Sequence, residues 1–322
     1  MEEAVLKVRH LKKYFPIKSG FFRKTTGYVK SVDDVSFDIG KNEIMGLVGE
    51  SGCGKTTTGR TILRLMDKTE GEVLYNGKDL FNMDKDSMLK IRPEIQMIFQ
   101  DPYSSLNPRM TVGEIVGEAA VDHGICTKSD VDERVKEVIT ACGLAPYHIK
   151  RFPHQFSGGQ RQRIGIARAL ILNPKFIVAD EPVSALDVSI QAQIINLLVK
   201  LQREKGFSCL FISHDLSVVE YICQKVGVMY LGSMVEFASK EELFKNPLHP
   251  YTKALLSAVP VPDPKIKRNR IILKGDIPSP ANPPSGCKFH TRCNYATEMC
   301  SKEAPEYKEI DKNHFVACHL YK

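Results

Sequence analysis

Short apolar runs alternate with longer stretches of helical periodicity along the first 235 residues of the chain. Runs of this length, rich in β-branched and aromatic residues and bounded by polar ones, predict buried strands. The predicted strands cover Ile44–Val48, 95–100, Phe176–Asp180, 209–215 and 226–232, the last of these being the final strand.

Helices are predicted where apolar side chains recur at three- and four-residue spacing. The clearest are 56–66 and 160–170. Residues 101–153 form a helical insertion by the same criterion, and 241–259 hold two helices separated by a proline-bounded break at 247–250. Strands that alternate with helices in this way predict an α/β domain.

The composition fits a folded globular protein. The chain has 322 residues, of which 43% are hydrophobic and 26% charged, with a net charge of +7. This length allows one large domain and a smaller one. No apolar run approaches the roughly 18–20 residues that a membrane span requires, and the first residues lack the order of a signal peptide. We therefore expect a cytoplasmic chain, or one peripheral to a membrane.

The sequence GESGCGKTT, residues 49–57, directly follows the first predicted strand. Glycines let successive backbone N–H groups point at phosphate oxygens, and the following helix adds its positive end. Lys55 supplies a cation for the β- and γ-phosphates, and Thr56 a hydroxyl for Mg²⁺. A chance glycine turn is the alternative, but it leaves the Gly-Lys-Thr ending unexplained. We predict a P-loop whose nucleotide-binding residues are Gly49, Ser51, Gly52, Cys53, Gly54, Lys55, Thr56 and Thr57.

Two adjacent carboxylates follow a second apolar strand. Asp180 ends this strand and Glu181 comes next. A carboxylate at the carboxyl end of a strand beside the phosphates can hold the Mg²⁺ shell, and Glu181 can then orient or deprotonate the attacking water. Alone, the pair also fits a strand-ending turn before Pro182. The P-loop in the same chain favours the catalytic interpretation.

A second helix start suited to an anion lies in QFSGGQRQRIGIARAL, residues 155–170. Ser157 is a good N-cap, and Gly158 and Gly159 leave the first-turn amides free. A kinase or a small switch GTPase has no evident use for a second such helix end in the same chain.

These residues resemble the ATP-binding-cassette (ABC) family, whose signature is Ser-Gly-Gly-Gln in this setting. The matches are Gln100 with the Q-loop glutamine, Ser157, Gly158, Gly159 and Gln160 with the signature, Asp180 and Glu181 with the Walker B pair, Ser184–Asp187 with the D-loop, and His214 with the switch histidine. The resemblance implies an α/β P-loop NTPase (RecA-like) core with a β-subdomain and a helical insertion. It also implies that ATP is held between the P-loop of one subunit and the signature helix of another, in a homo- or heterodimer.

The same resemblance assigns roles in the site. It implies catalytic roles for Glu181, His214 and Gln100, with ATP and Mg²⁺ as cofactors and with Thr56 and Gln100 on the Mg²⁺. An aromatic residue usually stacks on adenine in this family. Tyr28 is the candidate, and a buried strand tyrosine is the alternative.

The C-terminal part narrows the subgroup. NPLHPYTKALLSAVP, from residue 246, and PSPANPPSGCKFHTRC, from residue 278, resemble the C-terminal extension of ATPases that serve dipeptide and oligopeptide importers, closest to the second ATPase of such systems. The implied partners are a second cassette, two integral-membrane permeases at the cytoplasmic face of the membrane and, indirectly, an extracytoplasmic peptide-binding protein, with no nucleic acid. Nickel or metal-chelate importers share much of this pattern. A soluble ABC ATPase and a P-loop kinase of a small metabolite are the remaining alternatives.

Three segments are expected: a nucleotide-binding domain at 1–235 with a helical subdomain at about 101–171, a helical connector at 236–262, and a C-terminal extension at 263–322. Four cysteines lie in the extension: Cys287, Cys293, Cys300 and Cys318. Their wide gaps on a loop-rich chain suit a [4Fe–4S] cluster, which the resemblance also supports. Zinc is the second reading, with His290 and His319 nearby, and disulfides are the third. We expect the metal to act as a staple for an extension too small to fold alone.

Overall fold

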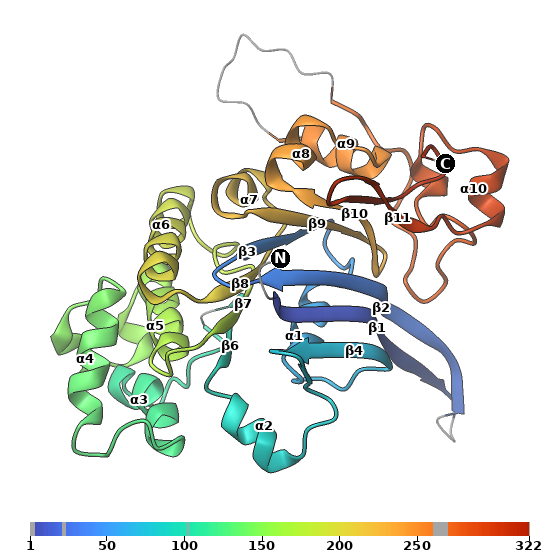
Figure 1. Ribbon diagram of the computed structural model, residues 1–322. Helices are drawn as coiled ribbons and strands as arrows, with labels where there is room; N and C mark the ends of the chain where they lie inside the picture. Colours follow the sequence, from blue (N-terminus) through green and yellow to red (C-terminus); the bar gives the residue numbers. More distant parts are fainter. Residues whose placement is uncertain (1–3, 21–23, 102, 260–269, 322) are drawn as a thin grey trace, which may run out of the picture. The chain divides into compact units, whose positions relative to one another are not determined.

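The computed structural model describes residues 4–20, 24–101, 103–259 and 270–321 (Figure 1). The chain divides into two compact units. Unit 1 comprises Met1–Val5, Ile39–Glu43 and Asn82–Ile212. Unit 2 comprises Leu6–Asp38, Ile44–Phe81 and Ser213–Lys322.

Unit 1 is built on three parallel strands, β6 (Ile95–Ile98), β7 (Phe176–Asp180) and β8 (Ser208–Ser213). Every residue of β7 and β8 is buried. Strands covered on both faces need continuous apolar sequence, which is why these runs could be identified from the sequence. Strand β7 matches its predicted run, whereas β6 and β8 each end two residues earlier than expected and β8 begins one residue earlier.

Helices make up most of the rest of unit 1. They are α2 (Lys85–Ile91), α3 (Val112–Asp122), α4 (Val131–Ala141), the 3₁₀ turns η1 (Pro146–Lys150) and η2 (Pro153–Gln155), α5 (Gly158–Leu170) and α6 (Val188–Lys205). Helices α3 and α4 fall in the segment predicted to be helical from its periodicity. Two of the helices, α3 and α5, begin with a reciprocal capping box, which satisfies two otherwise unpaired amides at the first turn.

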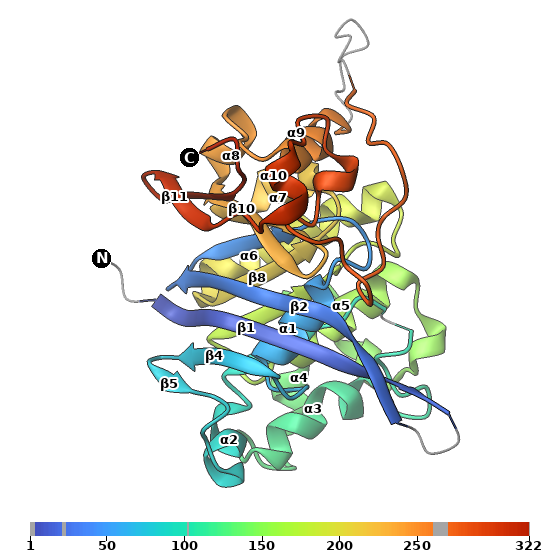
Figure 2. The same ribbon diagram turned by 90° about the vertical axis from the view of Figure 1, so that its right-hand side faces the viewer.

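Unit 2 holds an antiparallel sheet in the order β2 (Lys24–Gly40), β1 (Ala4–Ser19), β4 (Glu70–Tyr75) and β5 (Lys78–Asp79). The first residues of β1 and the last of β2 fall in unit 1 by the division above. Figure 2 shows β1 and β2 running side by side along this sheet.

A second group of strands in unit 2 contains β3 (Ile44–Val48), β9 (Lys225–Tyr230), β10 (Ser233–Ser239), β12 (His314–Ala317) and β11 (Tyr307–Asp311). Strand β3 pairs in parallel with β9, and the remaining pairs are antiparallel. The helices of unit 2 are α1 (Lys55–Ile62), α7 (Leu216–Ile222), α8 (Lys240–Lys245), α9 (Pro250–Ser257), η3 (His290–Arg292) and α10 (Glu298–Lys302). The two helices predicted on either side of residues 247–250 are thus confirmed.

Two sequence-based expectations are wrong. The strand predicted at 226–232 is not the last, because the chain reverses at Leu231 and Gly232 and continues as β10. Both residues have positive φ, as a two-residue hairpin turn with matching twist requires. Helix α1 ends at Ile62 rather than at 66, because Arg64 adopts φ 51° and the helix cannot continue through it.

Of the described helices, none is long and apolar enough to cross a membrane. The expected boundary between residues 262 and 263 lies outside the described residues. The three-segment division of the chain therefore stays a prediction.

Candidate active site

The P-loop lies in unit 2, between β3 and α1. Three of its glycines, Gly49, Gly52 and Gly54, have positive φ, and two of them pass very close to other backbone. A Cβ on Gly49 would lie 2.2 Å from the carbonyl oxygen of Met229, and one on Gly54 would lie 2.0 Å from that of Ser31. Glycine is therefore required at both positions by space as well as by conformation.

Lys55 begins α1, and its side chain returns over the loop. Its Nζ donates to the carbonyl oxygens of Gly49 at 2.7 Å and Glu50 at 3.1 Å, and the residue is 5% exposed. Gly54 precedes the helix in a left-handed conformation, and no side chain caps the first turn. The first-turn amides of α1 and the Lys55 ammonium thus form one positively polarised surface, the arrangement that binds phosphate.

The remaining P-loop residues differ in burial. Ser51 is exposed, Thr56 and Thr57 are half-buried in the first turn of α1, and Cys53 is 5% exposed. Burial raises the pKa of the Cys53 thiol, so this sulfur is neutral at ordinary pH. His214 is exposed on the link between β8 and α7, where Asp215 caps the helix. Tyr28 is 52% exposed on β2, so the alternative of a buried strand tyrosine does not describe it.

The predicted catalytic residues Gln100 and Glu181 meet in unit 1. The amide Nε2 of Gln100 donates to Glu181 Oε2 at 2.9 Å. Glu181 has φ 42°, an unfavourable value for a residue with a side chain, and its N–H donates to the Ile212 carbonyl at 3.0 Å. Asp180, the last residue of β7, is 1% exposed. A strained residue beside a buried acid at the carboxyl end of parallel strands has the geometry expected of a catalytic turn.

The signature residues form the amino end of α5, also in unit 1. Ser157 is exposed, its Oγ accepts from Gln160 N–H at 3.4 Å, and Gln160 Oε1 accepts from Ser157 N–H at 3.0 Å. A Cβ on Gly158 would lie 3.3 Å from Leu186 Cδ2, and one on Gly159 would lie 2.4 Å from Ile190 Cγ2. The two glycines therefore let the helix end pack directly against the D-loop and the start of α6.

The four C-terminal cysteines line one cavity in unit 2, with a volume of about 40 Å³. His290 and His319 line it as well. Burial, with the neighbouring thiols adding to it, raises the pKa of Cys287 to about 11 and raises the pKa values of Cys293 and Cys318. All four thiols are free, so the disulfide alternative is not realised. Within the described ranges, no group of three or more His, Cys, Asp or Glu side chains is compact enough to hold a single metal ion.

Two functional candidates were not identified from the sequence: Glu50 inside the P-loop and Arg292 beside Cys293. Arg292 donates to the Glu50 carboxylate at 2.7 and 3.1 Å. This pair joins residues 242 positions apart in the chain. The available signal was the acid itself, because a carboxylate in a loop that binds phosphates requires a nearby cation.

Comparisons with known proteins agree with this geometry. The ABC transporter family matches residues 32–184, and the family described as oligopeptide/dipeptide transporter, C-terminal region, matches residues 235–300. The oligopeptide transport ATP-binding protein AppF of Bacillus subtilis is 57% identical, covering 99% of this chain and 98% of that protein. OppF of Salmonella typhimurium, of the same description, is 53% identical over 98% of this chain and 96% of that protein.

Among solved structures, a dimeric ATP-binding cassette in a post-hydrolysis state with ADP and Pi matches 73% of this chain and 98% of its own, with a TM-score of 0.65 and 29% identity. The fold and the P-loop therefore define an ABC-type ATPase. The chain belongs to the family of oligopeptide transport ATP-binding proteins.

Proposed function

We propose that this ATPase drives the import of dipeptides or oligopeptides through two partner permeases at the cytoplasmic face of the cell membrane. The observation that carries the proposal is similarity along nearly the whole chain to oligopeptide transport ATP-binding proteins, including the C-terminal region specific to that group. Nickel import and soluble ABC functions have no comparable support.

The P-loop would bind the triphosphate of ATP. Backbone amides between Gly49 and Thr57 surround the phosphates, and the Lys55 ammonium can exchange its loop carbonyls for the β- and γ-phosphate oxygens. The hydroxyl of Thr56, the side chain of Gln100 and the carboxylate of Asp180 are the oxygen donors that suit Mg²⁺. When bound, Mg²⁺ neutralises charge on the phosphates.

Glu181 is the proposed general base. It can accept a proton from the attacking water or orient that water toward the γ-phosphate. Gln100 holds the carboxylate of Glu181 by the 2.9 Å hydrogen bond, so Gln100 positions the base. His214 keeps its catalytic role as the switch histidine, and Tyr28 its role in stacking on the adenine, as parts of this proposal.

The signature helix would complete the site of a second cassette. Ser157, which is exposed, and the half-buried Gly158 form the capped, glycine-opened end of α5 that would meet the nucleotide. ATP bound to the P-loop of one subunit would join the two cassettes through this helix end, and hydrolysis would let them separate. The partner cassette is a second copy or a related subunit.

The C-terminal extension, placed at 263–322, would carry a [4Fe–4S] cluster on Cys287, Cys293, Cys300 and Cys318. Four thiols around one cavity fit such a group, because iron–sulfur clusters are held by cysteine sulfurs bound as thiolates. Zinc would draw four sulfurs to about 3.8 Å from one another, given its bond length of about 2.3 Å. No ligand group compact enough for a single metal ion is found among the described residues, so the cluster proposal rests on the cavity that the four cysteines share. Its proposed function is to staple the extension.

Reconstitution tests the importer proposal. The chain is placed in liposomes with candidate permeases, a partner cassette and a peptide-binding protein, and uptake of a labelled peptide is measured with ATP inside. Peptide-stimulated ATP hydrolysis with uptake supports the proposal. Stimulation by a nickel chelate and not by peptides would move the chain to the metal importers.

A further inference from the structure

The C-terminal segment reaches into the P-loop through one side chain. Arg292 Nη1 donates to Glu50 Oε2 at 2.7 Å, and Nη2 donates to Oε1 at 3.1 Å, a two-bond fork between planar groups. The exposed fractions of the two side chains are 7% and 25%. Arg292 directly precedes Cys293, whereas Glu50 is the second residue of the P-loop.

The backbone of Glu50 is held at the same time. Its N–H donates to the Tyr251 hydroxyl oxygen at 2.8 Å, and its carbonyl accepts from Lys55 Nζ at 3.1 Å and from Cys53 N–H at 3.2 Å. Side chain, amide and carbonyl are thus all fixed. Glu50 therefore anchors the start of the P-loop, together with the bond from Lys55 to the Gly49 carbonyl.

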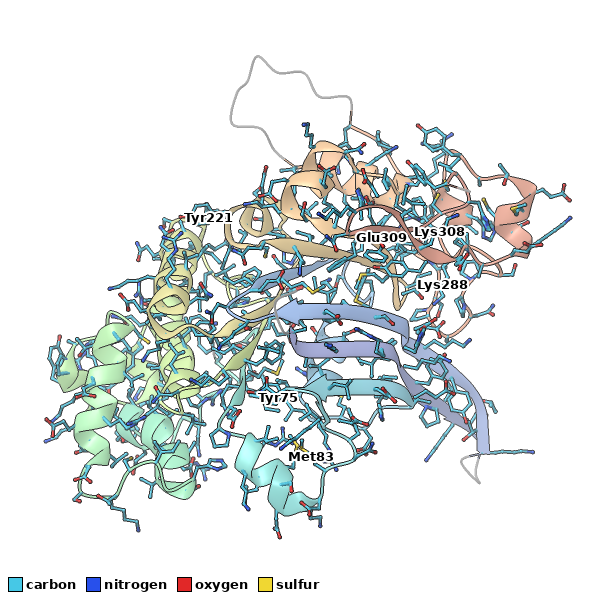
Figure 3. The ribbon with its side chains drawn as sticks, viewed as in Figure 1. Tyr75, Met83, Tyr221, Lys288, Lys308 and Glu309 are labelled. Atoms are coloured by element: carbon cyan, nitrogen blue, oxygen red, sulfur yellow. The ribbon has the colours of Figure 1, made fainter. Side chains whose placement is uncertain are left out.

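Arg292 is itself rigidly placed. The residue before its 3₁₀ turn, Phe289, is 1% exposed and packs against the rings of both Tyr230 and Tyr251, with centroids 5.2 and 5.4 Å away. Lys288 donates to Asp33 at 2.7 Å, from the side of the C-terminal segment that faces β2 (Figure 3). These contacts of Phe289 and Lys288 therefore hold Arg292 in place beside the P-loop.

We propose that Arg292 is a positioning residue for ATP binding, through which the cysteine-bearing segment 287–300 sets the affinity of the P-loop. The inference rests on the proposed function in that the P-loop binds ATP. Glu50 is an anion in a loop that receives a triphosphate, and its carboxylate would repel that ligand if unpaired. Arg292 neutralises the carboxylate and holds it in place. Because coupling between two sites is reciprocal, bound ATP must in turn stabilise segment 287–300.

The test measures binding of a fluorescent ATP analogue with Mg²⁺ to the full chain and its variants. Arg292→Gln should raise Kd about tenfold, the size of one charged hydrogen-bonded pair, while turnover at saturating ATP changes much less. The Kd of Arg292→Lys should lie between the Kd of the parent chain and that of Arg292→Gln. Glu50→Gln combined with Arg292→Gln should bind more tightly than Arg292→Gln alone, because the repelling carboxylate is gone. Lys302→Gln is the matched control, since it breaks an exposed ion pair with Glu298 in the same segment.

Hydrogen exchange supplies a second readout that does not depend on turnover. The nucleotide should slow exchange of amides in 287–300 in the parent chain, and this effect should be lost in Arg292→Gln. Equal affinity in Arg292→Gln and the parent, or no recovery in the double variant, overturns the inference. A parent chain that fails to bind ATP would overturn the proposed function instead.

Discussion

The side-chain amide of Gln100 donates a 2.9 Å hydrogen bond to the carboxylate of Glu181. The two residues follow neighbouring parallel strands, β6 and β7, at the same edge of the sheet. Ser184 Oγ also donates to the Glu181 carbonyl at 3.1 Å, which helps to hold the positive φ of this residue. The backbone and side chain of Glu181 are thus fixed before any substrate binds, as efficient general-base catalysis requires.

Glu181→Gln should keep ATP bound and slow its hydrolysis by about 10²- to 10⁴-fold, the usual contribution of a general base. The substitution preserves the acceptor oxygen for Gln100 and the size of the side chain, so only the ability to take a proton is lost. Single-turnover hydrolysis and retention of labelled ATP measure the effect. Glu204→Gln, on the exposed face of α6, is the control. Parent-like turnover in Glu181→Gln would remove the role given to this residue.

Ser157 and Thr111 allow a comparison of two helix caps in unit 1. Each forms a reciprocal capping box, Ser157 on α5 and Thr111 on α3. Replacing either by Arg should cost about 1 kcal/mol of stability through the lost cap. Only Ser157→Arg should abolish ATP-dependent dimerisation, because only this helix end is proposed to meet nucleotide. Thermal denaturation measures the loss of stability expected in both variants. Size-exclusion chromatography with ATP, using hydrolysis-deficient protein, measures the loss of dimerisation expected only in Ser157→Arg. Equal dimerisation of both variants would contradict the proposed ATP sandwich.

The glycines of the P-loop are not equivalent. A Cβ on Gly54 would lie 2.0 Å from the Ser31 carbonyl oxygen, whereas one on Gly52 would meet nothing within 4 Å. Gly54→Ala should therefore destabilise the chain by more than about 3 kcal/mol and eliminate ATP binding, since backbone must move. Gly52→Ala should cost only about 1–2 kcal/mol, for the left-handed conformation. Chemical denaturation compares the two. A Gly54→Ala chain as stable as Gly52→Ala would show that the close approach to Ser31 is absent.

The cysteine prediction concerns bound metal. Anaerobically purified protein should absorb broadly at about 400 nm, as iron–sulfur clusters do. Cys300→Ser should lose this absorption and destabilise segment 287–300, because one ligand of the cluster is missing. Cys126→Ser, outside the extension, should retain it. Protein that is colourless and contains zinc would contradict the cluster and support the zinc alternative.

The sequence predicted local features better than long-range ones. The N-cap role of Ser157 depends only on residues within one helical turn, so the local sequence was sufficient to predict it. Strand β7 was identifiable because burial on both faces demands a continuous apolar run. The reversal at Leu231 and Gly232 was missed, because only the glycine carries a turn signal and the following strand continues the apolar pattern.

In the site, too, residues within motifs were predicted from the sequence and contacts between distant residues were not. The P-loop and the candidate roles of Gln100 and Glu181 followed from motifs, whereas the hydrogen bond between these two side chains was not predicted. The ion pair between Arg292 and Glu50 was not predicted, because the position of Glu50 in the P-loop does not indicate which cation, 242 positions away, folding brings to it. The clustering of the cysteines around one cavity was expected from their number in the extension. Their distances from one another were not available from spacing.

His249 provides a prediction for pH. Its Nδ1 accepts from Tyr251 N–H at 3.0 Å at the start of α9, and the residue is 1% exposed. Burial lowers the pKa of His249 from 6.5 to about 4, with Lys253 adding to the effect and Glu236 opposing it. Between these values the unfolded chain binds more protons than the folded one, so stability present above pH 6.5 is lost as the pH falls toward 4.

The size of this effect is at most about 3 kcal/mol, from 1.36 kcal/mol for each pKa unit. His249→Asn keeps a cap acceptor for the Tyr251 amide and removes the titrating ring. The variant should therefore lose less stability than the parent between pH 6.5 and 4, although it is less stable at neutral pH because the contact of the ring with Phe289 is gone. Urea denaturation at several pH values measures both the stability at neutral pH and its loss between pH 6.5 and 4. Parallel pH profiles for the two proteins would mean that His249 titrates normally in the folded chain, and that its burial does not hold in solution.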